Sequence, residues 1–188
     1  MTLLAVGLAL FLGIHLVPAV PGARGALVAR LGEQRYKAAF SLASLAGLAL
    51  IVAGYAFGER GAQLFAPQPA ARAVAPLAMT VSIILLAAAN MRAHLRRALG
   101  HPMLLGLAIW STVHLLANGD ARGTLLFGAF LAYALIDLAS AVRRRAVKPF
   151  VPDAKYDLIA VVGGGAVALA VMTAHRLLFG VAVVPFGI

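Results

Sequence analysis

Six long apolar runs dominate this sequence, and they restrict the chain to a fold that lies within a lipid bilayer. A helix needs about 20 mostly apolar residues to cross the hydrocarbon core. Open sheet edges cannot survive in lipid, because every backbone polar group there must be satisfied internally. We therefore predict an all-α fold, a polytopic transmembrane helical bundle of about six helices, as a single integral membrane domain over residues 1–188. The predicted spans are 2–20, 39–57, 73–90, 102–117, 123–142 and 158–179.

Prolines and turn residues separate these runs. Pro18 and Pro21 close the first run, and Pro102 opens the fourth, which is the shortest, at a tolerated first-turn position. The Asn118-Gly119-Asp120 sequence is typical of a turn between the fourth and fifth runs. The first run lacks the positively charged start of a cleavable signal peptide, so we expect it to persist as a helix.

The charged residues give an independent indication of topology. The chain is 63% hydrophobic and 12% charged, with a net charge of +10. Four basic residues, Arg60, Arg72, Arg122 and Arg176, fall on one side of the predicted spans. The other twelve follow spans one, three and five: Arg24, Arg30, Arg35, Lys37, Arg92, Arg96, Arg97, Arg143, Arg144, Arg145, Lys148 and Lys155. Because cytoplasmic loops carry the basic excess, we predict a multi-pass protein of the inner (cytoplasmic) membrane with both termini on the non-cytoplasmic side.

The same charge distribution argues against a nucleic-acid partner, since short basic clusters between apolar runs are topology signals. The main partner is instead the lipid bilayer. The chain has no cysteine, which excludes disulfides, zinc–thiolate sites and thiol nucleophiles.

Few ionisable residues lie within the spans, and such residues are functional candidates because their burial in lipid is costly. His15 lies about 18–20 Å from the outer end of its helix, and His114 lies about 18 Å from the inner end of another. In a core of about 30 Å the two differ in depth by roughly 5–10 Å. Two imidazoles from different helices can therefore approach one point, an arrangement that suits a metal ion or a haem iron.

A second interpretation of the same histidines is structural, because a buried imidazole can simply form a hydrogen bond to a neighbouring helix. His101 is about 20 Å from His114 along one helix and cannot share a single ion with it, so we expect it near the cytoplasmic interface. Trp110 lies one helical turn before His114, where it packs either beside a ligand of His114 or towards lipid. Asp137, six residues before Arg143, is expected to snorkel or to form a salt bridge at the inner boundary rather than to serve as a proton relay.

An ordered set of motifs over nearly the whole chain resembles the NnrU family. The motifs are His15-Leu16-Val17-Pro18, Arg30-Leu31-Gly32-Glu33-Gln34-Arg35-Tyr36, Gly100-His101-Pro102, Trp110 and His114-Leu115-Leu116-Ala117-Asn118-Gly119-Asp120. The resemblance implies a membrane protein found with denitrification genes and linked to nitrite and nitric oxide reduction. The domain is also similar to 15-cis-zeta-carotene isomerases, which carry haem b. The implied cofactor is haem b, with His15 and His114 as its iron ligands, and the candidate cofactor-binding residues are His15, His114, His101 and Trp110.

Three functions remain open, the first two of them implied by the resemblance. The first is a bis-histidine haem-b protein for electron transfer or redox sensing, with a redox partner and with Arg96, Arg97 or Arg143 holding the haem propionates. The second is a haem-dependent cis–trans isomerase of a carotenoid, a hydrophobic polyene. Those isomerases can use a cysteine near the second histidine, where this chain has Ser111, which argues against their ligand exchange. The third is a non-enzymatic accessory or assembly protein whose histidines brace the bundle.

Overall fold

The computed structural model describes residues 1–184, and this part of the chain is helical throughout apart from its turns and loops. The predicted all-α fold is therefore confirmed. The elements are α1 (Thr2–Leu16), the 3-10 helix η1 (Val17–Ala19), α2 (Ala23–Leu31), α3 (Glu33–Phe57), α4 (Pro69–Ala88), α5 (His94–Leu99), α6 (Pro102–Asn118), α7 (Ala121–Arg143), α8 (Ala154–Thr173) and α9 (His175–Phe179).

Six of these elements correspond to the six predicted spans. Among the described residues, five segments are long and apolar enough to cross a membrane: α1 with η1, and α3, α4, α7 and α8. The sixth, α6, has 17 residues and is apolar but shorter. The prediction of a multi-pass membrane protein is confirmed, and so is the shortness of the fourth span.

Several predicted boundaries were wrong. The last span was predicted over 158–179, but α8 begins at Ala154 and ends at Thr173, where Ala174 leaves the helical conformation before α9. Helix α3 begins at Glu33, six residues before the predicted start. Gly32 interrupts the helix there with a φ of 78° and a ψ of 155°, a conformation that favours glycine. The short helices α2 and α5 lie in segments that were predicted as loops.

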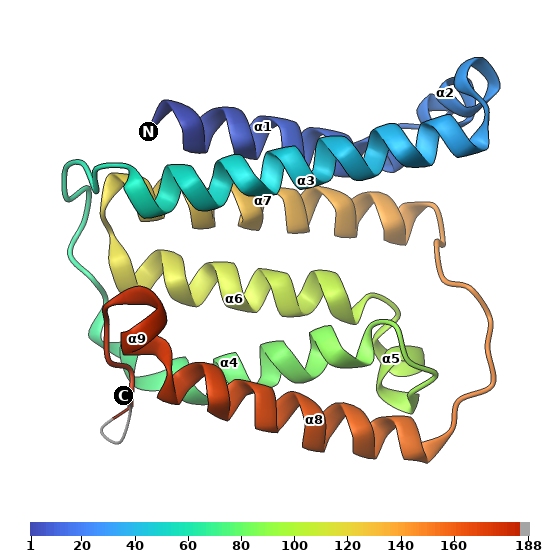
Figure 1. Cartoon of the computed structure of the whole chain (residues 1–188). Helices are drawn as coiled ribbons and strands as arrows, with labels where there is room; N and C mark the ends of the chain where they lie inside the picture. The colour runs from blue at the N-terminus through green and yellow to red at the C-terminus, as the bar shows by residue number, and fades with distance from the viewer. Residues whose placement is uncertain (185–188) are drawn as a thin grey trace.

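The long helices pack in the order α3, α1, α7, α6, α4, α8, each chiefly on its neighbours in that row. In the view of Figure 1, α3 overlaps α1 and α7. The order differs from the chain order, because α7 lies between α1 and α6. Packing is extensive within the α1–α3 pair and within the α4, α6, α7, α8 group, and it is sparse between α1 and α7. Helix α7 thus connects two parts of the molecule.

Glycines allow α1 and α3 to approach at backbone distance. A Cβ atom added to Gly7 would lie 2.6 Å from the Ile51 amide nitrogen, and one added to Gly47 would lie 2.8 Å from the Phe11 amide nitrogen. Small residues give such close contacts between membrane helices, where van der Waals packing largely replaces the hydrophobic effect as the driving force. The α1–α3 pair is therefore the most tightly joined part of the fold.

The segments that connect the helices lie at the two ends of the row, and the two ends differ in their number of basic residues. Helices α2 and α5 and the 144–153 segment lie at one end, whereas Met1, α9 and the turn between α6 and α7 lie at the other (Figure 1). The first of these ends carries the twelve basic residues that follow spans one, three and five. The predicted salt bridge of Asp137 is present there, with Arg144 at 3.7 Å. We call this the basic end.

Candidate functional site

His15 lies near the end of α1, and its ring is fixed by its own helix. The Nδ1 atom lies 2.6 Å from the carbonyl oxygen of Phe11, one turn earlier. A carbonyl oxygen only accepts, so Nδ1 must carry the proton that it donates. In the neutral imidazole this leaves the lone pair on Nε2 free to bind a metal.

His114, on α6, has the same local geometry. Its Nδ1 atom lies 2.9 Å from the carbonyl oxygen of Trp110, again one turn earlier. By the same reasoning, Nδ1 of His114 carries the proton and Nε2 keeps a free lone pair. Both histidines are half-buried, and their ring nitrogens form their hydrogen bonds within one helix rather than between helices.

An aromatic cluster connects the two histidines across one face of α7. The His114 ring stacks on Phe127, with 4.9 Å between ring centroids, and the His15 ring meets Tyr133 edge-on at 6.4 Å. Between these two points lies Phe130, which contacts Trp110 from α6 and Phe11 from α1. The structure therefore directs both histidines to the same helix face, although α1 and α6 are not neighbours in the row.

The separation of the two histidines can be measured along α7. His114 lies at the level of Phe127 and His15 at the level of Tyr133, six residues further on, which corresponds to about 9 Å at 1.5 Å per residue. This separation falls within the predicted range of depths.

The other two candidate cofactor-binding residues differ in their positions. Trp110 belongs to the aromatic cluster, with its ring centroid 5.2 Å from that of His114 and 5.0 Å from that of Phe127. It therefore packs beside His114 rather than facing lipid alone. His101 is the N-cap residue of α6, about 20 Å from His114 along the helix, so it does not join the His15–His114 group.

Two further histidines are held by polar groups outside the cluster. The Nδ1 atom of His94 lies 2.8 Å from the Asp157 carboxylate, which joins α5 to α8. The Nδ1 atom of His175 lies 2.8 Å from the carbonyl oxygen of Val181. Within residues 1–184, no three histidine, aspartate or glutamate side chains converge on one point, whereas a haem requires only one or two axial ligands from the protein.

Polar residues at the end opposite the basic end support His114, and sequence reasoning did not identify them. Asn118 donates its side-chain amide to the carbonyl oxygen of His114 at 2.6 Å. Gln63, from the 58–68 segment, donates to the carbonyl oxygen of Asn118 at 2.9 Å, and Arg72 donates to that of Ala117 at 3.2 Å. These bonds satisfy the free carbonyls at the end of α6. Spacing alone gave no signal, because Gln63 and Asn118 are 55 positions apart.

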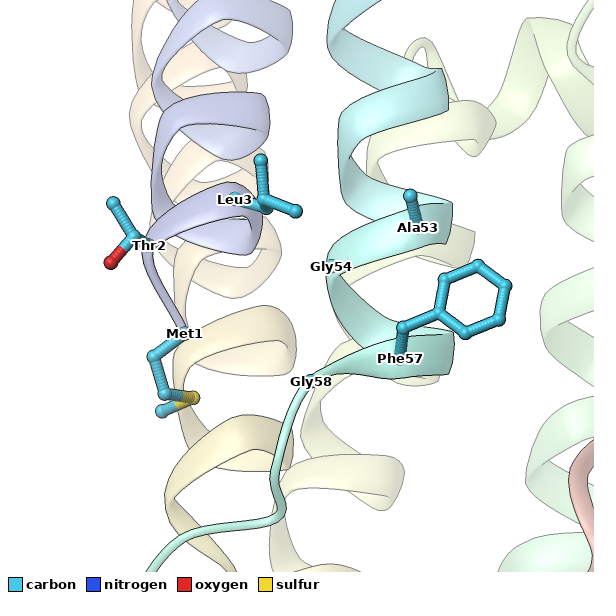
Figure 2. A pocket seen from close by; sticks show the side chains of 7 residues that line it. All are labelled: Met1, Thr2, Leu3, Ala53, Gly54, Phe57 and Gly58. Carbon is cyan, nitrogen blue, oxygen red and sulfur yellow. The ribbon is translucent and has the colours of Figure 1, made fainter.

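Two pockets lie elsewhere in the structure. One has a volume of about 290 Å³ and lies between the start of α1 and the end of α3, where Leu3 and Phe57 line it (Figure 2). His15 is 13 residues along α1 from Thr2, about 20 Å away, so this pocket is remote from the histidines. The other is an apolar pocket between α4 and α8, on the far side of α6 from α1.

A family model described as "NnrU protein" matches residues 3–183. The chain belongs to the NnrU family. This match covers almost the entire described chain, including both histidines and the aromatic cluster. No curated protein and no solved structure matches the chain in the comparisons made.

Proposed function

We propose that this NnrU-family protein is a membrane haem-b protein in which His15 and His114 supply the axial imidazole ligands. The observation that carries the proposal is the shared geometry of the two histidines. Each uses Nδ1 for a carbonyl oxygen of its own helix, which leaves Nε2 with a lone pair. Metal-binding histidines are oriented in just this way by a hydrogen bond from the other ring nitrogen.

The chemistry of the surrounding residues supports a haem. The two imidazoles face an aromatic and aliphatic environment built from Phe11, Trp110, Phe127 and Phe130, which would exclude water and pack against a macrocycle. A haem also has two propionates, which require cations at the membrane surface. Arg144 lies at the basic end, where its guanidinium pairs with Asp137 and donates to the carbonyl oxygen of Pro18, three residues after His15.

Arg144 lies closer along the row of helices to His15 than does Arg96, which was considered from the sequence. Arg96, on α5, donates to the carbonyl oxygen of Met91 and lies over the Phe150 ring. Helix α5 packs with α4, α6 and α8, so Arg96 is far along the row from His15. We propose that Arg144, with Arg143 beside it, interacts with the propionates.

A haem iron held by two imidazoles supplies one-electron transfer, and its potential is set by the axial ligands and their hydrogen bonds. The protein's own contribution would be to fix both rings through Phe11 and Trp110 carbonyls and to keep water away. We propose electron transfer or redox sensing in the cytoplasmic membrane, in support of nitrite and nitric oxide reduction, as the family resemblance implies.

The local hydrogen bonds also bear on the alternatives. A bracing role requires the histidines to bond between helices, whereas both Nδ1 atoms bond within their own helix. The isomerase alternative places a second ligand near His114, at the position of Ser111. Ser111 is buried and donates its hydroxyl to the carbonyl oxygen of Leu107 at 2.7 Å. The ring contacts of both histidines with α7 would also serve a bracing role, whereas no contact specifically supports the isomerase alternative.

The deciding experiment is an absorption spectrum of protein purified in detergent from haem-replete cells, with haem content measured per chain. We expect a Soret band that weakens or shifts in both His15→Ala and His114→Ala. His94→Ala is the matched control, because its ring bonds to the Asp157 carboxylate between α5 and α8, away from the cluster, and it should keep the spectrum of the unaltered protein. A colourless protein, or two variants with unchanged spectra and haem content, would refute the proposal.

A further inference from the structure

The second pocket is an apolar groove between α4 and α8, on the opposite side of the molecule from the histidines. Its volume is about 350 Å³, within the range of small-molecule sites. Four residues of α4 and the turn after it line one wall, and four residues of α8 line the other: Ile83, Leu86, Ala87, Met91, Ile159, Gly163, Gly164 and Val167. The lining is almost wholly apolar.

The groove is open in part because two of the four α8 residues that line it are glycines. A Cβ atom added to Gly164 would lie 2.8 Å from the Cα of Ile84, so Gly164 sets the close contact between α8 and α4. A Cβ atom added to Gly163 would meet nothing within 4 Å. The two neighbouring glycines therefore have opposite roles: Gly164 brings the helices together, and Gly163 leaves the space beside them open.

The groove follows the helix axis towards the basic end. Ile159, Gly163 and Val167 recur every four residues on one face of α8 and cover about 12 Å. One turn before Ile159, Tyr156 continues the same face. It packs against the buried cluster of Ala88, Ala93 and Ala160, as do Ala87 and Met91, which line the groove. Tyr156 thus marks the end of the groove nearest the basic end.

Two cations lie over the Tyr156 ring. The Arg92 guanidinium is 5.6 Å from the ring centroid and the Lys155 ammonium is 5.2 Å from it. Lys155 is paired with Asp153 at 3.1 Å, whereas Arg92 has no carboxylate within salt-bridge distance among residues 1–184. The hydrogen bonds from Lys155, helped by the charge of Arg92, hold the pKa of the Asp153 carboxyl below its usual value. The Asp153 carboxylate is therefore charged and is paired with Lys155.

An apolar groove that ends at an arginine without a salt bridge fits an amphiphile with a negative head group. We propose that the α4–α8 groove binds one acidic phospholipid, with an acyl chain against Gly163 and its phosphate at Arg92. The charge excess at this end points to the cytoplasmic leaflet, whose acidic lipids attract basic residues near the membrane surface. Basic pockets between transmembrane helices on this side are known to hold such head groups.

The test uses native mass spectrometry on the full-length protein, delipidated in detergent and mixed with phosphatidylglycerol or phosphatidylcholine that carry identical oleoyl chains. The unaltered protein should retain one phosphatidylglycerol in preference to phosphatidylcholine. Gly163→Leu fills the groove and should abolish retention of that lipid. Gly165→Leu is the matched control, because its Cβ also meets nothing within 4 Å and it does not line the groove; it should bind as the unaltered protein does.

The head group is tested separately. Arg92→Gln should reduce the preference for phosphatidylglycerol over phosphatidylcholine by about fivefold, which corresponds to about 1 kcal/mol for one basic residue near an anionic surface. Arg97→Gln removes the same charge from the exposed side of α5 and should leave the preference unchanged. Equal retention of the two lipids by the unaltered protein, or equal retention by the Gly163 and Gly165 variants, would overturn the proposal.

Discussion

Glycine serves two opposite purposes in the two outer helix pairs of this protein. In the α1–α3 pair, Gly7, Gly47 and Gly54 each lie so close to the facing backbone that no side chain fits. In the α4–α8 pair only Gly164 makes such a contact, and Gly163 beside it faces open space. In the first pair the glycines allow the two backbones to touch, and in the second Gly163 leaves a groove between the helices unfilled. A glycine in a membrane helix therefore cannot be assigned a packing role from its presence alone.

The largest expected effect in this comparison belongs to Gly54→Ala. The new Cβ would lie 2.7 Å from the Leu4 Cα and closer still to its amide nitrogen, and backbone atoms cannot move aside without moving α1. We expect a loss of about 1–3 kcal/mol of stability, the usual cost of overpacking, measured as a fall in the unfolding midpoint in detergent. Gly13→Ala is the control on α1, since its Cβ meets nothing within 4 Å. A Gly54 variant as stable as the control would show that α1 and α3 are less tightly packed than described.

Gly164→Ala should lower stability by less than Gly54→Ala does. Its Cβ would lie 2.8 Å from the Ile84 Cα, but the next contact is with the Ile84 side chain, which can adopt another rotamer. Both substitutions gain about 1 kcal/mol of helix propensity, so the ranking rests on the packing cost, which for Gly164→Ala should be near the lower end of about 1–3 kcal/mol. The same unfolding measurement gives the ranking, and an effect larger than that of Gly54→Ala would reverse the comparison.

Ser82→Ala tests what holds the α4 wall of the groove. The Ser82 hydroxyl is fully buried and donates to the carbonyl oxygen of Gly106 on α6 at 2.7 Å. Its loss should cost about 0.5–1.5 kcal/mol, the usual net contribution of one hydrogen bond, while phosphatidylglycerol retention persists if α4 keeps its position. Loss of lipid binding in a variant that unfolds normally would indicate that this bond sets the width of the groove.

The smallest effect, and the one of opposite sign, is expected for Gly163→Ala. The added methyl group has open space, so only the helix-propensity gain of up to about 1 kcal/mol remains. We expect an unfolding midpoint that is equal to or above that of the unaltered protein. A clear fall would mean that the space beside Gly163 is filled by protein, which would remove the distinction between the two glycine pairs.

The sequence predicted the membrane helices well because each carries its own signal. Apolar length and flanking prolines located all six, including the short α6. Helix ends were less predictable where the deciding residue was a backbone feature. Gly32 separates α2 from α3 and Ala174 separates α8 from α9, and neither position differs from the many other glycines and alanines in the chain.

The candidate site was predictable only in part. His15 and His114 are conspicuous because imidazoles are rare in apolar helices, and their spacing along each helix gives their depth. Both histidines contact α7 because α7 lies between α1 and α6. No local sequence pattern predicts this position of α7. The support of α6 by Gln63 and Arg72 likewise depends on contacts between distant segments. Contacts of this kind arise from packing, and no single stretch of sequence specifies them.

The position of α7 in the row has a consequence for how the chain is assembled during synthesis. Helices α1 and α3 can pair once residue 57 has left the ribosome, and α4 and α6 once residue 118 has done so, yet these two hairpins have no substantial packing with each other. Helix α7 is made later and must enter between them. Until it does, both histidines are present in the membrane, but the helix face that unites them is not. The site is therefore completed by an insertion event, and a ligand held by both histidines can be captured only by a chain whose translation has passed Arg143.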